Sequence, residues 1–168
     1  MDAEILINDN LDANAINDKM NENCETELHL AAAQNMKLSA MSLIKLGAEV
    51  NAVCKLNESP LHKAIKNGHS NMVHFLLENG ADLNSKNKNG ETPVYVAIEF
   101  NQKKCLALLL QKGADVNGCG ENWTPLTKAI DCNKIDCVRL LIEKGADLNI
   151  LDPNGWTPVL TAISKDKI

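Results

Sequence analysis

The sequence predicts an all-α solenoid in which short helix–turn–helix units are stacked one on another. A phrase of seven residues recurs in similar form, as in "SPLHKAI", "TPVYVAI" and "TPLTKAI". Its starting residues are 33, 33, 32 and 33 positions apart: Thr26, Ser59, Thr92, Thr124 and Thr157. A second marker keeps the same period, with the glycines of "LGAEVN" and its relatives at Gly47, Gly80, Gly113 and Gly145. Two motifs in phase at this period indicate a repeat architecture.

Each unit begins with residues that are typical of a helix start. In the unit at Ser59, the hydroxyl can accept a hydrogen bond from an unpaired amide of the first turn. Pro60 suits the first helical position, because its missing N–H is not needed there. Ala64 has a counterpart in every unit and is small enough for neighbouring helices to approach closely. The recurring phrase is therefore predicted to be the first helix of each unit.

A turn, a second helix and a loop complete the unit. The turn is clearest as "NGHSN" at 67–71, and an apolar stripe with helical spacing follows it: Met72, Val73, Leu76 and Leu77. Gly80 is expected to end this helix, because glycine tolerates the left-handed conformation. Asn89-Gly90 is a turn dipeptide, so the loop after Gly80 is predicted to be hairpin-like. One unit cannot bury its apolar face alone, and its neighbours must do so.

The stretch "SPLHKAIKNGHSNMVHFLLENGADLN" closely resembles the ankyrin repeat, whose signature is T-P-L-H-x-A with a period of 33 residues. The resemblance extends from about Thr26 to the end of the sequence. It implies a non-catalytic protein–protein interaction module, such as an inhibitor or a host-directed effector. An alternative is a fragment of a larger ankyrin array whose effector domain lies elsewhere. An enzyme or a small-ligand-binding protein is the third class.

The period divides the chain into one continuous series of units. The predicted ranges are 26–58, 59–91, 92–123 and 124–156 for four repeats, with 157–168 as a partial repeat and 1–25 as a degenerate half-repeat. In the last of these, "ILINDNLDANA" aligns with "FLLENGADLNS", which predicts a capping helix at about Ala3–Asp9. Asn10 then replaces the glycine and Asn14 the loop asparagine, in a loop four residues longer than usual. A disordered acidic tail is the other interpretation of 1–25.

The partial repeat beginning at Thr157 has the residues of a first helix only. We expect Val159, Ala162 and Ile163 to pack back onto the fourth unit. The sequence is compatible with half a repeat as a natural cap and equally with a fragment of a longer array.

Composition narrows the class of partner. The net charge is −5 and the single arginine is Arg139, without a Lys/Arg cluster, which disfavours nucleic acid. No apolar run has the length of a membrane span.

Apolar residues make up 45% of the chain and aromatic residues only 3%, so the core is expected to be aliphatic. The six cysteines form no C-x-x-C pair. We interpret them as reduced thiols of an intracellular, monomeric protein in the cytoplasm, with nucleus or host-cell cytoplasm also compatible.

The candidates for catalysis are weak. His29 and His62 stand at the signature position of the family, where the resemblance implies an imidazole that bridges the backbone of adjacent loops. At this position the later units have Tyr95, Thr127 and Leu160 instead. No metal-binding spacing and no nucleotide-binding glycine motif occur. We therefore expect no catalytic activity, no metal and no cofactor.

The resemblance also implies where a protein partner would bind. In such stacks the residue before the Thr-Pro lies at the base of the loop and faces the concave groove, as do exposed positions of the first helix. The first set is Glu25, Glu58, Glu91, Trp123 and Trp156. The second set is Lys63, Lys66, Glu99, Phe100, Lys128 and Asp131. We expect acidic residues to select charge at one end and aromatic residues to anchor the partner at the other. Alternatively, each tryptophan simply covers the neighbouring loop.

The resemblance further implies a modification. Loop asparagines of ankyrin-like proteins can be hydroxylated by the oxygenase called factor inhibiting hypoxia-inducible factor. The residues preceding Asn117 match its preferred pattern fully, and those preceding Asn51 nearly so. The other interpretation is that these asparagines only tie the loops by hydrogen bonds.

Overall fold

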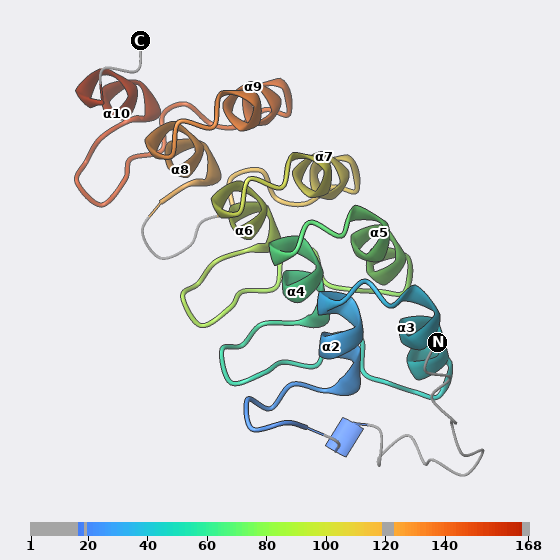
Figure 1. The fold of residues 1–168 in the computed structure, drawn as a ribbon. Coiled ribbons are helices and arrows are strands. Elements are labelled where there is room, and N and C mark those ends of the chain that lie inside the picture. The colour runs from blue at the N-terminus through green and yellow to red at the C-terminus, as the bar shows by residue number, and fades with distance from the viewer. Residues whose placement is uncertain (1–16, 19, 119–122, 166–168) are drawn as a thin grey trace.

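The structure is a computed structural model that describes residues 17–18, 20–118 and 123–165. Its described part contains helices and no strand, and Figure 1 shows them stacked in two rows with the loops projecting to one side. The inner row, next to the loops, is α2 (Glu27–Ala33), α4 (Pro60–Lys66), α6 (Pro93–Glu99), α8 (Pro125–Asp131) and α10 (Pro158–Ser164). The outer row is α3 (Lys37–Lys45), α5 (Ser70–Glu78), α7 (Lys103–Gln111) and α9 (Ile135–Glu143). The predicted all-α solenoid is confirmed.

The inner helices begin as their sequences indicate. Thr124 precedes α8 in extended conformation, and its Oγ1 accepts a hydrogen bond from the Thr127 N–H at 3.1 Å. Thr92 and Thr157 cap α6 and α10 in the same way. Proline occupies the first turn of each inner helix except α2. Hydroxyl and proline together fix where each inner helix starts.

The turn between the two helices of a unit needs one residue in the left-handed conformation. Gly68 fills this place with φ +72°, and the corresponding residues of the other complete units are asparagines: Asn35, Asn101 and Asn133, with φ between +55° and +58°. Asparagine is among the residues that tolerate this region best after glycine. The loss of glycine therefore changes the sequence pattern and leaves the turn intact.

The core lies between the two rows of helices and is aliphatic, as expected. In the second unit Leu61 and Ile65 of α4 and Met72, Val73 and Leu76 of α5 are completely buried. The outer helix of the first unit differs, since Ala40 is the only residue of α3 that is fully buried. Ser39 and Ser42 occupy its stripe where the other units have larger apolar residues. The first unit therefore gains less from burial than the second.

The loops are hairpin-like and are tied to each other. The Asn87 N–H donates to the Glu91 carbonyl at 3.0 Å within one loop, and the Lys88 N–H donates to the Leu56 carbonyl of the preceding loop at 2.8 Å. Within a loop, the side-chain oxygen of one polar residue accepts two backbone N–H groups of the tip. This residue is Asn21, Asn87 or Asp152.

A second set of asparagines joins successive units. Asn51 Oδ1 accepts from the Asp82 N–H at 2.9 Å, and its Nδ2 donates to the Gly80 carbonyl at 3.0 Å. Asn84 and Asn117 accept in the same way from the N–H groups of Asp115 and Asp147. We call Asn17, Asn51, Asn84 and Asn117 the asparagine ladder. Each member satisfies backbone groups just beyond the outer helix of the next unit.

Asn17 corrects the predicted register of the N-terminal segment. Its Oδ1 accepts from the Glu49 N–H at 2.9 Å and its Nδ2 donates to the Gly47 carbonyl at 3.2 Å, which are the contacts of a ladder member. Asn17 stands nine residues before Thr26, whereas Asn51 stands eight before Ser59. The loop is thus one residue longer than usual and not four. The apolar alignment failed because the position is set by hydrogen bonds. The helix predicted at 3–9, Asn10 and Asn14 lie outside the described residues.

The C-terminal helix also differs from expectation. Val159 and Ile163 were expected to pack onto the fourth unit, but their side chains are 52% and 55% exposed. Pro158 and Thr161 are the buried residues of α10, and Ala162 is half-buried. The equivalent positions of the inner helices in complete units are buried, as Leu61 and Ile65 are in α4, so their burial depends on elements that α10 does not contact among the described residues.

We predict that amide hydrogen exchange is slower in α5 than in α3. The buried stripe of α5 must be exposed for its amides to open, whereas α3 loses little burial. Exchange followed by mass spectrometry on the intact chain measures this. Equal protection, or slower exchange in α3, would contradict the interpretation.

Candidate protein-binding surface

The charged residues of the inner face are largely paired with each other. Glu58, at the base of the second loop, has a side chain that is only 2% exposed. Lys63 lies 2.9 Å from its Oε2, and Lys66 pairs with its Oε1. Lys63 also reaches Glu25 of the preceding loop at 2.6 Å. These four residues form a compact cluster of alternating charge that joins the first unit to the second.

The pKa values of this cluster follow from the pairing. Burial raises the pKa of the Glu58 carboxyl, but hydrogen bonds from Lys66 and Lys63 outweigh burial and hold it below its ordinary value. The hydrogen bonds from Lys63 and then Asn21 lower the pKa of Glu25. Burial lowers the pKa of Lys63, but its two carboxylate partners leave it raised overall. All members of the cluster with shifted values are thereby held in their charged forms at neutral pH.

Glu58 was expected to face the groove and to select charge, but its side chain is buried, and Lys63 and Lys66 of the following helix neutralise its charge. Glu91 is half-buried, and its Oε2 accepts from Asn87 Nδ2 at 2.6 Å. The sequence carried a signal for the pairing at Glu58. Lys63 and Lys66 stand four and seven residues after Ser59, so they lie one turn apart on one face of α4.

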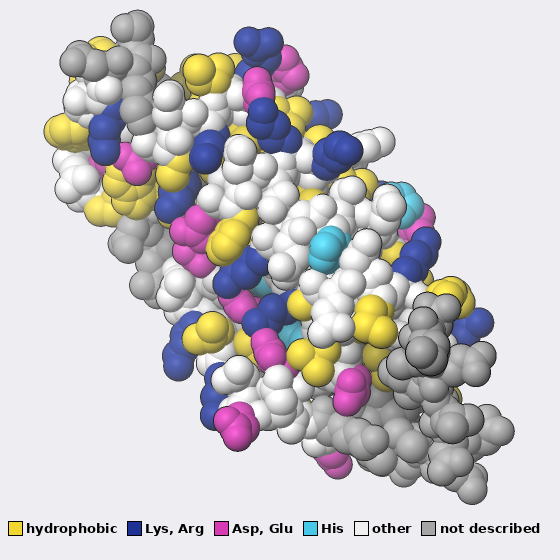
Figure 2. All heavy atoms as spheres, in the orientation of Figure 1, with side chains coloured by type: hydrophobic (Ala, Val, Ile, Leu, Met, Phe, Trp, Pro, Cys, Tyr) yellow, Lys and Arg dark blue, Asp and Glu magenta, His cyan; other side chains and the backbone are white. Residues whose placement is uncertain are grey.

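A second series of contacts joins the later units. Lys128 lies 3.4 Å from Glu99 and 5.2 Å from the ring centre of Tyr95, both in the preceding unit. Lys66 stands 5.4 Å from the ring centre of Phe100, and Lys165 lies 2.6 Å from Asp131. Tyr95 is buried, and its ring contact with Lys128 was missed because its position in the signature suggested only a replaced histidine. Figure 2 shows Lys and Asp or Glu side chains next to each other along this face.

The aromatic residues of the predicted site differ in exposure. The side chains of Phe100 and Trp156 are each 42% exposed, whereas Trp123 is half-buried. Phe100 follows α6 and Trp156 precedes the cap of α10, so α8 separates the two inner helices beside which they stand. The Trp156 N–H donates to Asp152 Oδ1, which holds the backbone while the indole remains accessible.

The signature histidines are structural at both positions. The Nδ1 of His29 accepts from the Thr26 N–H at 3.1 Å, so its Nε2 carries the proton and donates to the Glu58 carbonyl at 2.9 Å. His62 repeats the contacts of Nδ1 with Ser59, while its buried Nε2 makes no hydrogen bond of good geometry. Burial lowers the pKa of both imidazoles. The bridge between loops implied by the resemblance is complete at His29 and partial at His62.

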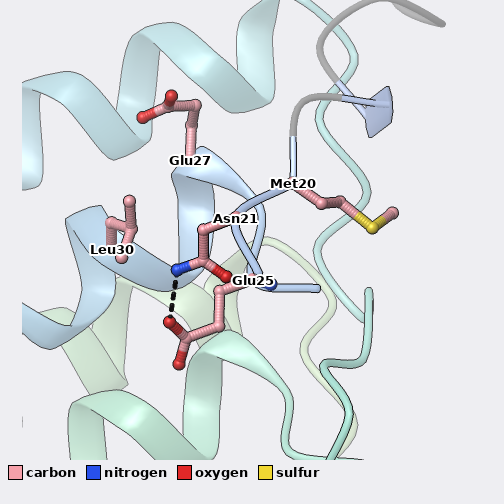
Figure 3. A pocket seen from close by; sticks show the side chains of 5 residues that line it. All are labelled: Met20, Asn21, Glu25, Glu27 and Leu30. Carbon is pink, nitrogen blue, oxygen red and sulfur yellow. Dashed lines mark hydrogen bonds between the residues drawn. The ribbon is translucent and has the colours of Figure 1, made fainter. Parts of the chain in front are cut away.

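The structure has an open pocket at its N-terminal end, with a volume of about 260 Å³. Figure 3 shows its five lining residues: Met20, Asn21, Glu25, Glu27 and Leu30. Asn21 Nδ2 donates to Glu25 Oε2 at 2.8 Å, and Glu25 is also bound to Lys63. Part of its polar lining is thus already engaged within the protein. Among the described residues, no three potential ligand side chains lie close enough to hold a metal ion.

The fold and this surface define a helical repeat protein whose units join through loops and inner helices. The family model "Ankyrin repeats (3 copies)" matches the chain three times, at residues 3–87, 28–118 and 115–168. The chain therefore belongs to the ankyrin-repeat family. Ankyrin repeats are generally protein–protein interaction modules without catalytic activity. A search of curated proteins found no match. In the described part, no helix has the length and apolar character needed to cross a bilayer.

The side chain of Asn117 accepts from the Asp147 N–H, and both polar ends of Asn51 are hydrogen-bonded. These contacts agree with the interpretation that both asparagines tie the loops together by hydrogen bonds. Their hydroxylation stays a prediction from the family pattern.

We predict that Glu58→Ala lowers the free energy of unfolding by about 2 kcal/mol, because it leaves two lysines without their buried partner. Denaturant titration followed by circular dichroism measures the change. The matched control is Asp136→Ala, which breaks the exposed pair of Asp136 with Lys103 and should change stability little. Equal effects of the two variants would show that the Glu58 cluster is not a structural joint.

We predict that acidification destabilises the fold as the pH falls through 6.5, the ordinary pKa of the histidines. The unfolded chain then binds protons that the folded chain, with its lowered histidine pKa values, does not bind. The double variant His29→Thr and His62→Thr has at both positions the residue that the fourth unit has there, Thr127. Its free energy of unfolding should depend less steeply on pH. Urea midpoints measured across this pH range test it, with exposed His74→Ala as control. An unchanged slope in the double variant would contradict this origin.

Proposed function

We propose that the protein is a non-catalytic binding module that takes a protein partner on the inner face and loop tips of its stack. The observation that carries this is the exposure of Phe100 and Trp156 on a surface whose charges are mostly paired. Paired charges add little net attraction for a partner, because they must first lose their own contacts. Exposed aromatic side chains offer large contact areas at low entropic cost and are enriched among residues that carry binding energy.

The electrostatic part of the proposal follows from the pairing. Glu58 contributes to the surface by holding Lys63 and Lys66 in place. Glu25, Glu91, Glu99 and Asp131 remain partly accessible and, with Lys128, form a rim of mixed charge. Such a rim selects among partners more by excluding like charges than by raw affinity. The partner is therefore expected to present an apolar anchor flanked by charges of both signs.

The finer parts of the proposal concern the setting. We propose that the protein is a monomer in the cytoplasm, a compartment in which thiols stay reduced. Cys105 and Cys137 are free and buried. Burial raises the pKa of the Cys105 thiol to about 11, so this thiol stays protonated and unreactive. An inhibitor or a host-directed effector fits a short stack of this kind. The alternative is a scaffold fragment whose effector domain lies outside this chain.

We predict that Trp156→Ala and Phe100→Ala each weaken binding to a partner isolated by pull-down, by about 2 kcal/mol where the residue is an anchor. Trp123→Ala should have a smaller effect, because less of its indole is accessible. Calorimetric titration measures the affinities, and circular dichroism checks that the variants fold. Ile135→Ala is the matched control, since Ile135 is exposed on outer helix α9. If both variants fold and bind the partner normally, the aromatic end of the inner face is not the binding site.

A further inference from the structure

Three exposed lysines stand on two successive loops of a chain whose net charge is −5. Lys55 belongs to the loop that precedes α4, and Lys86 and Lys88 belong to the loop that precedes α6. The ends of these loops, residues 52–57 and 83–90, contain no acidic residue. We call the three side chains the lysine patch. It is a local concentration of positive charge on a chain that is acidic as a whole.

The lysine patch is not neutralised within the stack. The lysines of α4 and α8 pair with carboxylates at the joints, whereas no acidic side chain of the described residues lies within ion-pair distance of the lysine patch. The acidic residues at the bases of these two loops are engaged elsewhere. Glu58 is bound by two lysines of α4, and Glu91 accepts a hydrogen bond from Asn87. The positive charge at the loop ends is therefore available to a partner.

A large apolar side chain is exposed beside the lysine patch. Leu56 follows Lys55 directly, and its carbonyl accepts a hydrogen bond from the Lys88 N–H at 2.8 Å. Its side chain is 54% exposed. Leu56 thus has one lysine next to it along the chain and another across the hydrogen bond. Figure 1 shows the loops on the side of the inner helices, and Figure 2 shows Lys and hydrophobic side chains beside one another on that side.

The backbone under the patch is already ordered. Besides the bond at Leu56, Asn57 Nδ2 donates to the Lys86 carbonyl at 2.6 Å and joins the same two loops. Within the second loop, the side-chain oxygen of Asn87 accepts the N–H groups of Asn89 and Glu91. A partner that binds here has little backbone to immobilise, which lowers the entropic cost of binding.

The sign of the charge changes between neighbouring loops, which limits the size of the ligand. At the position of Lys55, the loop before α2 has the exposed Glu22 and the loop before α10 has Pro153. Asp18 adds a second exposed acidic group to the first of these loops. A nucleic acid or an anionic bilayer covers a wider area and would also meet these acidic groups. A short acidic segment can lie on the two lysine-bearing loops and avoid them.

We propose that the lysine patch binds a short acidic segment of a protein partner, with an apolar side chain of that segment against Leu56. Carboxylates of the segment pair with the lysines, and the apolar contact fixes where along the loops the segment lies. Complementary charge of this kind favours the correct partner and speeds its encounter. The inference rests on the proposed function, because it gives a chemical class to the part of the partner that meets the loop tips.

The probe is a labelled synthetic peptide, "DELEDLDE", titrated with the full chain and followed by fluorescence anisotropy. We expect saturable binding that weakens as the salt concentration rises, since the lysines are exposed. The double variant Lys55→Glu and Lys88→Glu should bind at least about tenfold more weakly. Leu56→Ser should also weaken binding. Both variants should keep the circular dichroism of the unaltered chain, because the substituted side chains are exposed.

Two controls match charge and composition. The double variant Lys112→Glu and Lys144→Glu changes the net charge equally, at exposed lysines that follow the outer helices α7 and α9, and should leave binding unchanged. The neutral peptide "NQLQNLNQ" keeps both leucines and should not bind.

Absence of saturable binding, or equal weakening in the two double variants, would overturn the inference. Tighter binding that depends on the lysine patch, to phosphatidylserine vesicles or to a single-stranded oligonucleotide, would identify a membrane or a nucleic acid as the ligand and would also overturn it. Failure of the peptide is distinguishable from failure of the proposed function, because the Phe100 and Trp156 variants test that function with a pulled-down partner.

Discussion

The structure depends on one constraint: no unit alone can pair all of its backbone hydrogen-bonding groups or bury its apolar face. Each loop leaves polar groups that the asparagine of the preceding loop binds, as Asn51 binds the Asp82 N–H and the Gly80 carbonyl. Each inner helix leaves an apolar side that its outer helix and the next unit must cover. Because every joint is of the nearest-neighbour kind, the stability of the stack is approximately a sum over units and joints. The period of the sequence is the visible result of this constraint.

The same constraint explains why the inner face is less available for charge recognition than its composition suggests. A charged residue at the base of a loop lies where two units meet, so its partner is found within the stack. Lys63 bridges Glu25 and Glu58 across such a joint, and Lys128 meets Glu99 across another. Charged pairs at these joints hold neighbouring units in register. Phe100 and Trp156 keep a large exposed fraction beside these joints, which is why we propose them for partner binding.

Sequence reasoning recovered the features set by local chemistry and missed those set by neighbours. Hydroxyl caps, prolines and the period predicted the helices, because each depends on a few adjacent residues. The burial of Glu58 was not predicted, since it requires knowing that Lys63 and Lys66 turn back toward the loop that precedes their helix. The N-terminal register was misplaced because Asn17 is identified by hydrogen bonds to another unit. The packing of Val159 and Ile163 was mispredicted because an apolar pattern does not say which element covers it.

The third residue after each cap shows how the joints change along the chain. His29 bridges to the Glu58 carbonyl, Tyr95 turns its ring to Lys128, and Thr127 folds back on the Thr124 carbonyl at 2.9 Å. At Leu160 the position becomes apolar and open. His29 and Tyr95 thus use this position for contacts with the next unit, whereas Thr127 uses it within the first turn of its own helix. The same place in the repeat therefore serves either the joint or the helix start, depending on which side chain stands there.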